Sequence, residues 1–485
     1  MSTATSSTQS TGKTFFGHPR ALANLFSVEM WERFSFYGMQ GLLAYYMYYS
    51  ATEGGLGMDK TLALSLVGAY GGAVYLSTIL GAWLSDRLFG SERVLFFSAI
   101  GIMAGHVALA LLPGFIGLIL GLVLIAVGSG GLKANATALV GSLYSKEDPR
   151  IDAGFSIFYM GVNIGGLVGP LLTGWLQVNF GFHVGFGAAA VGMAIGLSIY
   201  AAGRKNLPES AGIPNNPLPA DERKRYVVIF ASVIVLIIAA FATGIVTPAN
   251  LASTLAYVVI AASIVYFTLI LRSRKVDATE RKHVLAFIPF YIGSAAFWAL
   301  FQQQFTFIAA YSDARLDRTI GNWEMPPSWV TSINPIFIII FAGVFAAMWT
   351  KLGKRQPATG IKFGLALIVV GIAFLSFIPL ESFEKTPLLA LVGILLLCTF
   401  AELLLSPVGQ AVATKLAPAA FGTQMIALFF LSISLGTTLS GVLAGYYTEG
   451  NEIAYFIGMG GTAAILGVAM MAATPALKKL MGSVR

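Results

Sequence analysis

The chain has 485 residues, of which 56 % are hydrophobic and 11 % charged, with a net charge of +8 and a mean hydropathy of +0.78. A soluble domain carries about 25 % charged residues, so this composition excludes a soluble protein and indicates an integral membrane protein. Apolar stretches of about 17 or more residues recur along the chain, long enough for helices that cross a hydrocarbon layer of about 30 Å. A membrane β-barrel would show alternating segments of about ten residues instead. The predicted fold class is an all-α polytopic membrane protein.

The apolar stretches predict fourteen transmembrane helices. Residues 1–20 form a polar tail without the apolar core of a signal peptide, and residues 478–485 form a second tail. The predicted spans are 21–49, 62–85, 94–112, 115–143, 154–177, 182–203, 226–246, 251–271, 284–310, 328–350, 363–379, 387–414, 421–447 and 453–477.

Lysine and arginine residues predict the orientation, because positively charged loops remain cytoplasmic. If both termini are cytoplasmic, only Lys60, Arg315, Arg318 and Lys385 face outward, and two further basic residues lie inside spans. The positive net charge is therefore a topology signal, with a possible attraction to anionic lipid, and no nucleic-acid partner is expected.

The polar segment 204–225 contains four prolines, as is typical of a linker. It follows a first six-helix bundle, residues 21–203. The spans within 226–271 contain almost no polar side chains and look peripheral, and residues 284–477 supply six further spans. Two six-helix bundles that rock about a central site are therefore expected, with two additional helices between them. The turn "GAWLSDRLFGSER" resembles the loop signature of the major facilitator superfamily.

Five charged residues fall inside predicted spans: Glu29, Glu32, Arg33, Lys133 and Glu402. Each costs about 2.5–3.5 kcal/mol at the centre of a membrane helix, so these charges must be paired, hydrated or functional.

Helical spacing places Glu29, Arg33, Tyr37 and Gln40 on one polar face. A purely structural interpretation pairs Glu29 with Arg33 and leaves Glu32 without a cationic partner. A carboxylate in excess of its local cation, lining a cavity, is instead typical of a proton-carrying site.

Three segments carry a resemblance to a known family. "EMWERFSFYG" at 29–38 resembles the E-x-x-E-R-F-x-Y-Y-G motif of the proton-dependent oligopeptide transporters of the major facilitator superfamily, and residues 152–170 and 401–418 are similar to the family's fifth- and tenth-helix segments. The two additional helices are typical of bacterial members. The resemblance implies a proton-coupled symporter that imports di- and tripeptides by alternating access. It also implies a monomer in the bacterial cytoplasmic membrane, with no enzymatic activity and no cofactor besides the coupling proton.

The resemblance also implies roles for individual residues. Lys133 would interact with the peptide carboxylate, and Glu402 would receive the peptide amino group. The implied proton-coupling residues are Glu29, Glu32, Arg33 and Lys133, and the implied substrate-binding residues are Tyr37, Gln40, Tyr75, Lys133, Asn163, Gln302, Asn334 and Glu402.

The sequence departs from the family pattern at Phe36, Gln40 and Gln302, where many members have Tyr, Arg and Glu. In the family, the Arg and the Glu at the positions of Gln40 and Gln302 form a salt bridge that closes a gate between the bundles on the outer side. We expect the two glutamines to hydrogen-bond to each other instead, so that the gate has no charge. Because these residues alter the recognition site, a proton-coupled carrier of another small organic solute remains an alternative function. An intramembrane enzyme is disfavoured because the sequence contains no H-E-x-x-H or G-x-S-x-G motif, and a membrane receptor would not need buried titratable groups.

Overall fold

The computed structural model describes residues 14–145, 148, 150–448 and 450–482. Helices dominate it, because a backbone in hydrocarbon must satisfy its hydrogen bonds within the segment. In the described ranges the only strands are β1 (Thr319–Ile320) and β2 (Trp323–Glu324), which form a small antiparallel hairpin. The predicted all-α class is confirmed. Thirteen helical segments of the described chain are long and apolar enough to cross a membrane. Helix α1 (Arg20–Tyr48), with its four charged residues, is the fourteenth span.

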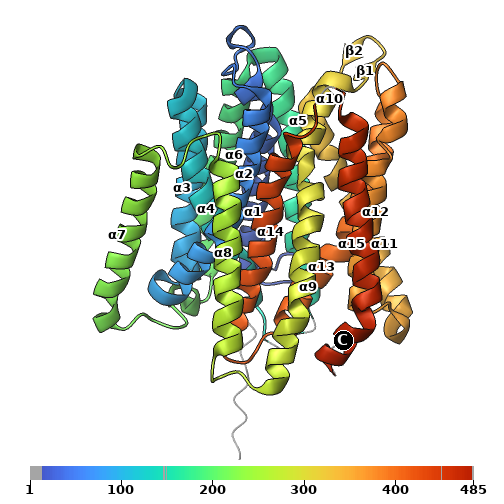
Figure 1. The fold of residues 1–485 in the computed structure, drawn as a ribbon. Helices are drawn as coiled ribbons and strands as arrows, with labels where there is room; N and C mark the ends of the chain where they lie inside the picture. The colour runs from blue at the N-terminus through green and yellow to red at the C-terminus, as the bar shows by residue number, and fades with distance from the viewer. Residues whose placement is uncertain (1–13, 146–147, 149, 449, 483–485) are drawn as a thin grey trace, which may run out of the picture.

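The first bundle consists of helices α1 to α6, and Figure 1 shows how they are arranged. Helix α1 packs against α5 and α6, and α3 packs against α4. Glycine allows α4 to approach α2 closely, since a Cβ at Gly130 would lie 2.4 Å from the backbone of Ser77. The bounds are α1 Arg20–Tyr48, α2 Lys60–Leu84, α3 Ser91–Leu111, α4 Gly114–Ser142, α5 Ile151–Phe180 and α6 Phe182–Gly203.

The second bundle also supplies six spans, one of which is interrupted. The expected span 284–310 is divided into α9 and α10 by the 3-10 turn η5 (Gln302–Phe305). The Gln303 side-chain amide donates to the Ala299 carbonyl, which a continuing α-helix would use for its own backbone. The span 328–350 starts with the 3-10 turn η6 (Pro327–Ser332). The helices are α9 Ala278–Phe301, α10 Phe307–Arg315, α11 Ile333–Leu352, α12 Thr359–Leu375, α13 Leu388–Lys415, α14 Gly422–Ala444 and α15 Glu452–Met481.

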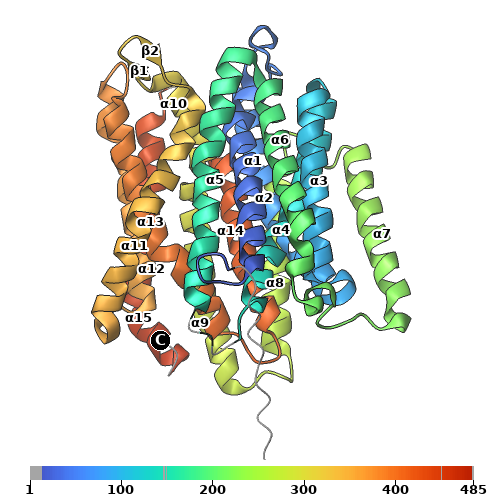
Figure 2. The ribbon, with the colours of Figure 1, turned by 180° about the vertical axis from the view of Figure 1, so that it is seen from behind.

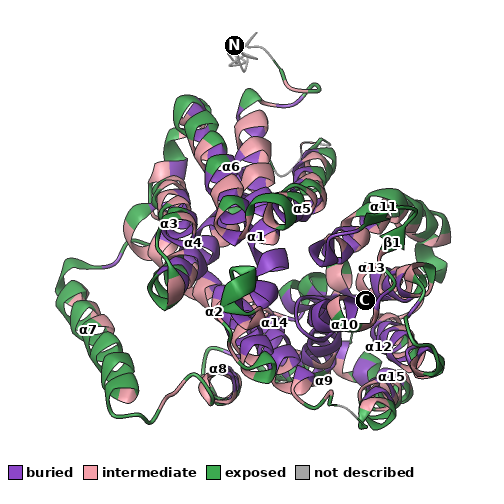
Figure 3. Cartoon of the chain, turned by 90° about the horizontal axis from the view of Figure 1, so that it is seen from above, coloured by how far each residue is buried: buried purple, intermediate pink, exposed green. Residues whose placement is uncertain are grey.

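The two additional helices, α7 (Ala220–Ala242) and α8 (Leu251–Arg272), differ in how they pack. Helix α8 lies against α2 and α14. Helix α7 has no buried residue and stands apart from both bundles (Figures 1 and 3). It is attached mainly near its first turns, where Trp83 of α2 contacts the rings of Tyr226 and Phe230.

The bundles meet along two seams, α2 with α14 and α5 with η6 and α11 (Figures 2 and 3). At the first seam a Cβ on Gly68 would lie 2.5 Å from Gly441, so the backbones approach as closely as glycine allows. At the second, Trp329 Nε1 donates to the Leu171 carbonyl over 2.9 Å. One end of the molecule carries most of the basic connections, 85–90, 204–219, 273–277 and 353–358, and is called the basic end below.

Candidate functional site

A cavity of about 1070 Å³ lies between the two bundles. Its first wall is formed by α1, α2, α4 and α5, and its second by α9, η5, α11, α13 and α14. Asp86, Arg87 and Gln424 line it near the basic end, so the cavity extends to that end. The expected site residues that line it are Glu29, Arg33, Tyr37, Gln40, Tyr75, Lys133, Asn163, Gln302, Asn334 and Glu402; Glu32 lies behind the wall.

Arg33 joins both carboxylates of the α1 motif. Its Nε lies 3.2 Å from Glu29 Oε1 and 2.6 Å from Glu32 Oε2. Glu32 is fully buried and also accepts a hydrogen bond of 3.1 Å from Ser129 of α4. The expectation that a Glu29–Arg33 pair leaves Glu32 over is therefore wrong, because the guanidinium contacts both neighbours. Two carboxylates still share one cation, so the motif retains an excess negative charge.

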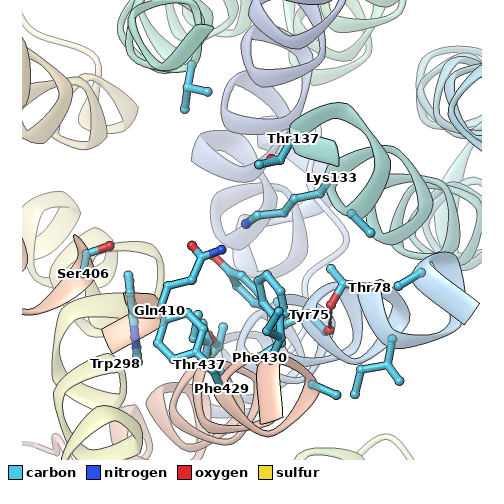
Figure 4. A pocket seen from close by; sticks show the side chains of 18 of the residues that line it. Tyr75, Thr78, Lys133, Thr137, Trp298, Ser406, Gln410, Phe429, Phe430 and Thr437 are labelled. Atoms are coloured by element: carbon cyan, nitrogen blue, oxygen red, sulfur yellow. Dashed lines mark hydrogen bonds between the residues drawn. The ribbon is translucent and has the colours of Figure 1, made fainter. Parts of the chain in front are cut away.

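Lys133 approaches this motif from α4. Its Nζ lies 4.1 Å from the centre of the Tyr75 ring on α2, a distance at which a cation is attracted by the ring face. Figure 4 shows the lysine extending into the cavity above Tyr75. Lys133 forms no salt bridge within the described residues, so its charge faces an aromatic ring and the cavity.

Glu402 is held by neutral groups on the second wall. Asn334 Nδ2 of α11 donates to Glu402 Oε2 over 3.2 Å and to Thr399 Oγ1 over 3.0 Å, which connects α11 to α13. In the part of the chain that the structure describes, Glu402 makes no salt bridge. The cavity thus contains a cation on one wall and a carboxylate on the other, each without an ionic partner.

The two glutamines expected at the gate are both buried, with 5 % exposure for Gln40 and 8 % for Gln302. They do not hydrogen-bond to each other in this conformation. Gln40 Oε1 has no hydrogen-bond partner in the described ranges. Gln302 lines the cavity together with Tyr75 of α2.

Asn163 and Tyr37 complete the expected set. The Asn163 side-chain amide donates to the Tyr159 carbonyl one turn earlier in α5, over 2.9 Å. The Tyr37 ring stacks on Phe305 of the opposite bundle, with ring centres 6.1 Å apart. The ring of Phe36 lies 5.2 Å from the Arg33 guanidinium, so phenylalanine keeps a contact with the motif without a hydroxyl.

Sequence reasoning missed the contacts that close the cavity at the end opposite the basic end. The Tyr48 and Tyr49 hydroxyls, at the end of α1, donate to Asp313 of α10 over 2.8 and 2.7 Å. Beside them, the Tyr45 hydroxyl donates to the Ala309 carbonyl over 3.1 Å. Four tyrosines in "AYYMYYS" were the available signal, but their partner lies more than 260 residues away. Tyr48, Tyr49 and Asp313 are called the tyrosine latch below.

Several other cavity residues were also missed. Figure 4 shows that they come from α2, α4, α9, α13 and α14. Helical spacing gave a signal for two of them, because Ser406 and Gln410 follow Glu402 at intervals of four residues. The residues are Thr78, Thr137, Trp298, Ser406, Gln410, Phe429, Phe430 and Thr437.

The described residues contain no group of three or more His, Cys, Asp and Glu side chains that could hold a metal ion. The chemistry that the arrangement offers is ionic pairing and hydrogen bonding between two facing walls.

Comparisons with known proteins agree with this architecture. The family described as PTR2, or POT family, matches residues 92–461. The chain is 42 % identical over 477 residues to the uncharacterized transporter YclF of Bacillus subtilis, with 97 % of each chain covered. It is 39 % identical over 492 residues to a di-/tripeptide transporter of Lactococcus lactis subsp. cremoris, with 98 % of this chain and 99 % of the other covered.

Solved structures are similar over the same length. A mutant of the peptide transporter POT in complex with alafosfalin superposes with a TM-score of 0.93 at 43 % identity, with 97 % of each chain covered. A POT family transporter in complex with 5-aminolevulinic acid gives a TM-score of 0.90 at 36 % identity, covering 96 % of this chain and 98 % of the other. The chain belongs to the POT family of transporters.

Proposed function

We propose that this protein is a proton-coupled symporter that imports di- and tripeptides by alternating access. The observation that carries the proposal is the placement of Lys133 and Glu402 on opposite walls of one cavity, each without an ionic partner. A peptide with free termini presents one carboxylate and one ammonium group, so it can complete both pairs at once. The name of the Lactococcus relative and the alafosfalin complex of the POT relative support the same substrate class.

The α1 motif is the proposed site of proton coupling. Protonation of Glu29 or Glu32 removes one negative charge from the pairing with Arg33 and changes the field at Lys133. The lysine then becomes more available to the substrate carboxylate. Binding of peptide and proton together stabilises the closed arrangement, and their release into the cytoplasm resets it.

The remaining pocket residues are proposed to position the peptide rather than to carry charge. Asn334 holds Glu402 for the amino group, and Asn163, Tyr37 and Tyr75 offer polar groups to the peptide backbone. Gln40 and Gln302 give a neutral gate, so Lys133 is the main cation for the carboxylate.

The proposal places the protein in the bacterial cytoplasmic membrane as a monomer, with both termini and the basic end in the cytoplasm. The tyrosine latch then lies on the outer side, and the cavity extends toward the cytoplasm. In this orientation the proposal takes the structure as the inward-facing stage of the cycle.

Uptake of labelled dialanine into proteoliposomes, with and without an inward proton gradient, tests the function. We expect accumulation that requires the gradient and that a protonophore abolishes. Equal uptake under both conditions would contradict proton coupling, and the absence of dialanine and trialanine uptake would contradict the substrate class.

A second candidate is a carrier of another amino acid-like solute on the same fold. The neutral Gln40 and Gln302 favour it, and a POT family relative was crystallised with 5-aminolevulinic acid. Competition of that compound with labelled dialanine, measured in the same vesicles, distinguishes the two. Uptake of the acid with no uptake of any peptide would favour this candidate.

A further inference from the structure

Helix α13 presents a row of polar side chains to the cavity. Glu402, Ser406 and Gln410 follow one another at intervals of four residues and all line the cavity. Side chains at this spacing occupy one face of a helix, one turn apart. The row leads from the proposed amino-group site toward the basic end.

Gln410 is positioned to act together with Lys133. Figure 4 shows the Gln410 side chain, from α13, and the Lys133 side chain, from α4, pointing toward one another across the cavity. Gln410 is exposed to the cavity, and its side chain makes no hydrogen bond within the described ranges. A carboxylate placed between the two residues would accept from the ammonium group and from the amide.

The depths of the three groups match peptides of different length. Measured from the basic ends of their helices at 1.5 Å per residue, Gln410 lies about 7.5 Å deep, Lys133 about 14 Å and Glu402 about 20 Å. An extended peptide covers at most about 3.3–3.6 Å per residue, so a dipeptide reaches about 7 Å and a tripeptide about 10 Å. From Glu402, a dipeptide ends at the level of Lys133 and a tripeptide ends between Lys133 and Gln410.

We propose that Gln410 is a specificity-determining residue that binds the carboxylate of tripeptides together with Lys133, while dipeptides use Lys133 alone. The proposal rests on the proposed function, because it takes Glu402 as the amino-group site. A tripeptide carboxylate then joins α4 to α13 between the two bundles, on the side where the cavity extends to the basic end.

Peptide affinities of the Gln410→Ala variant test this inference. Competition with labelled dialanine in proteoliposomes gives the affinities of dialanine, trialanine and trialanine amide for both proteins. We expect trialanine affinity to fall about 10- to 100-fold, the effect of losing one hydrogen bond to a charged group. The affinities for dialanine and for trialanine amide should change less than twofold, because neither compound places a carboxylate at Gln410.

The matched control is Gln424→Ala, which removes another glutamine that lines the same cavity, on α14 near the basic end. It should leave the ratio of trialanine to dialanine affinity unchanged. An equal loss of affinity for both lengths in Gln410→Ala, or an equal loss for trialanine and its amide, would overturn the inference. Failure of the proposed function is recognised separately, since the unmodified protein would then show no gradient-driven peptide uptake.

Discussion

The two walls of the cavity balance their charges in different ways. On the first wall Arg33 lies within 3.2 Å of Glu29 and 2.6 Å of Glu32, so most of the charge is compensated within one helix. On the second wall Glu402 contacts only the Asn334 amide among polar groups of the described residues. On the first wall Arg33 contacts both carboxylates in the absence of a ligand, whereas Glu402 has no cationic partner among the described residues. The proposed function accordingly places proton coupling on the first wall and amino-group recognition on the second.

Removal of a carboxylate from the first wall should have the largest effect. Glu32→Gln leaves Arg33 without its closest partner, and an amide cannot carry a proton. Without a titratable side chain at this position the coupling proton cannot be carried, so gradient-driven dialanine uptake should fall to the level measured without a gradient. Exchange of labelled for unlabelled dialanine at equal pH should persist, since peptide binding does not need Glu32.

The control for this variant is Glu92→Gln, which removes a carboxylate from the first bundle outside the cavity. Glu92 is paired with Arg204 at 2.7 Å and should be neutral for transport. Full gradient-driven uptake in Glu32→Gln would disprove the assignment of coupling to the first wall.

A change on the second wall should act on affinity instead. Glu402→Gln keeps an acceptor for Asn334 but loses the charge that attracts the ammonium group. We expect the KM for dialanine to rise about 10- to 100-fold, because a charge-assisted hydrogen bond contributes about 1.5–3 kcal/mol. N-acetyl-dialanine lacks the ammonium group, so its inhibition constant should be nearly the same in both proteins. If Glu402→Gln weakened the binding of the acetylated peptide by the same factor, Glu402 would act on the fold of the pocket instead of on the ammonium group.

The sequence was sufficient for the architecture because its signals are local. Each span is a continuous apolar stretch, and charges such as Lys133 and Glu402 stand out because a membrane helix tolerates so few. The partners of those charges were less predictable. Glu32 was expected to be left over because helical spacing favours the Glu29–Arg33 pair, yet a long, flexible arginine reaches its immediate neighbour as well.

Contacts between the bundles could not be read from one sequence. The break in the span 284–310 and the bond from Tyr48 to Asp313 depend on how residues far apart in the chain meet. The spacing of four residues from Glu402 through Ser406 to Gln410 is visible in the sequence, but only the structure shows that all three line the cavity. Polar residues on one face of a membrane helix serve equally well for helix packing.

At the end of the molecule opposite the basic end, the tyrosine latch joins the two walls that the cavity separates elsewhere. Replacement of Tyr48 and Tyr49 by Phe keeps the rings and removes both hydroxyls that donate to Asp313. The outer-closed state should lose about 1.5 kcal/mol or more, which favours the outer-open state about tenfold. Spin labels at exposed Thr52 and Asn322, one on each bundle, should then report a larger population of long distances.

These measurements require replacement of the single native cysteine, Cys398, which is buried in α13. Cys398→Ala therefore serves as the common background, and Tyr446→Phe, an exposed tyrosine outside the latch, is the matched control. An unchanged distance distribution in the double variant would mean that the latch does not hold the outer end closed.

Changes at Gln40 and Gln302, the two glutamines of the proposed neutral gate, should have the smallest effect and test whether the two walls depend on each other. Gln40→Arg alone adds a cation to the first wall, and Gln302→Glu alone adds a carboxylate to the second. Each single variant should lower dialanine uptake about three- to tenfold, because a new charge in a buried gate lacks a partner. The double variant adds both charges together and should recover to near the uptake of the unmodified protein. If the single variants are tolerated as well as the double variant, the two glutamines act independently and do not form a paired gate.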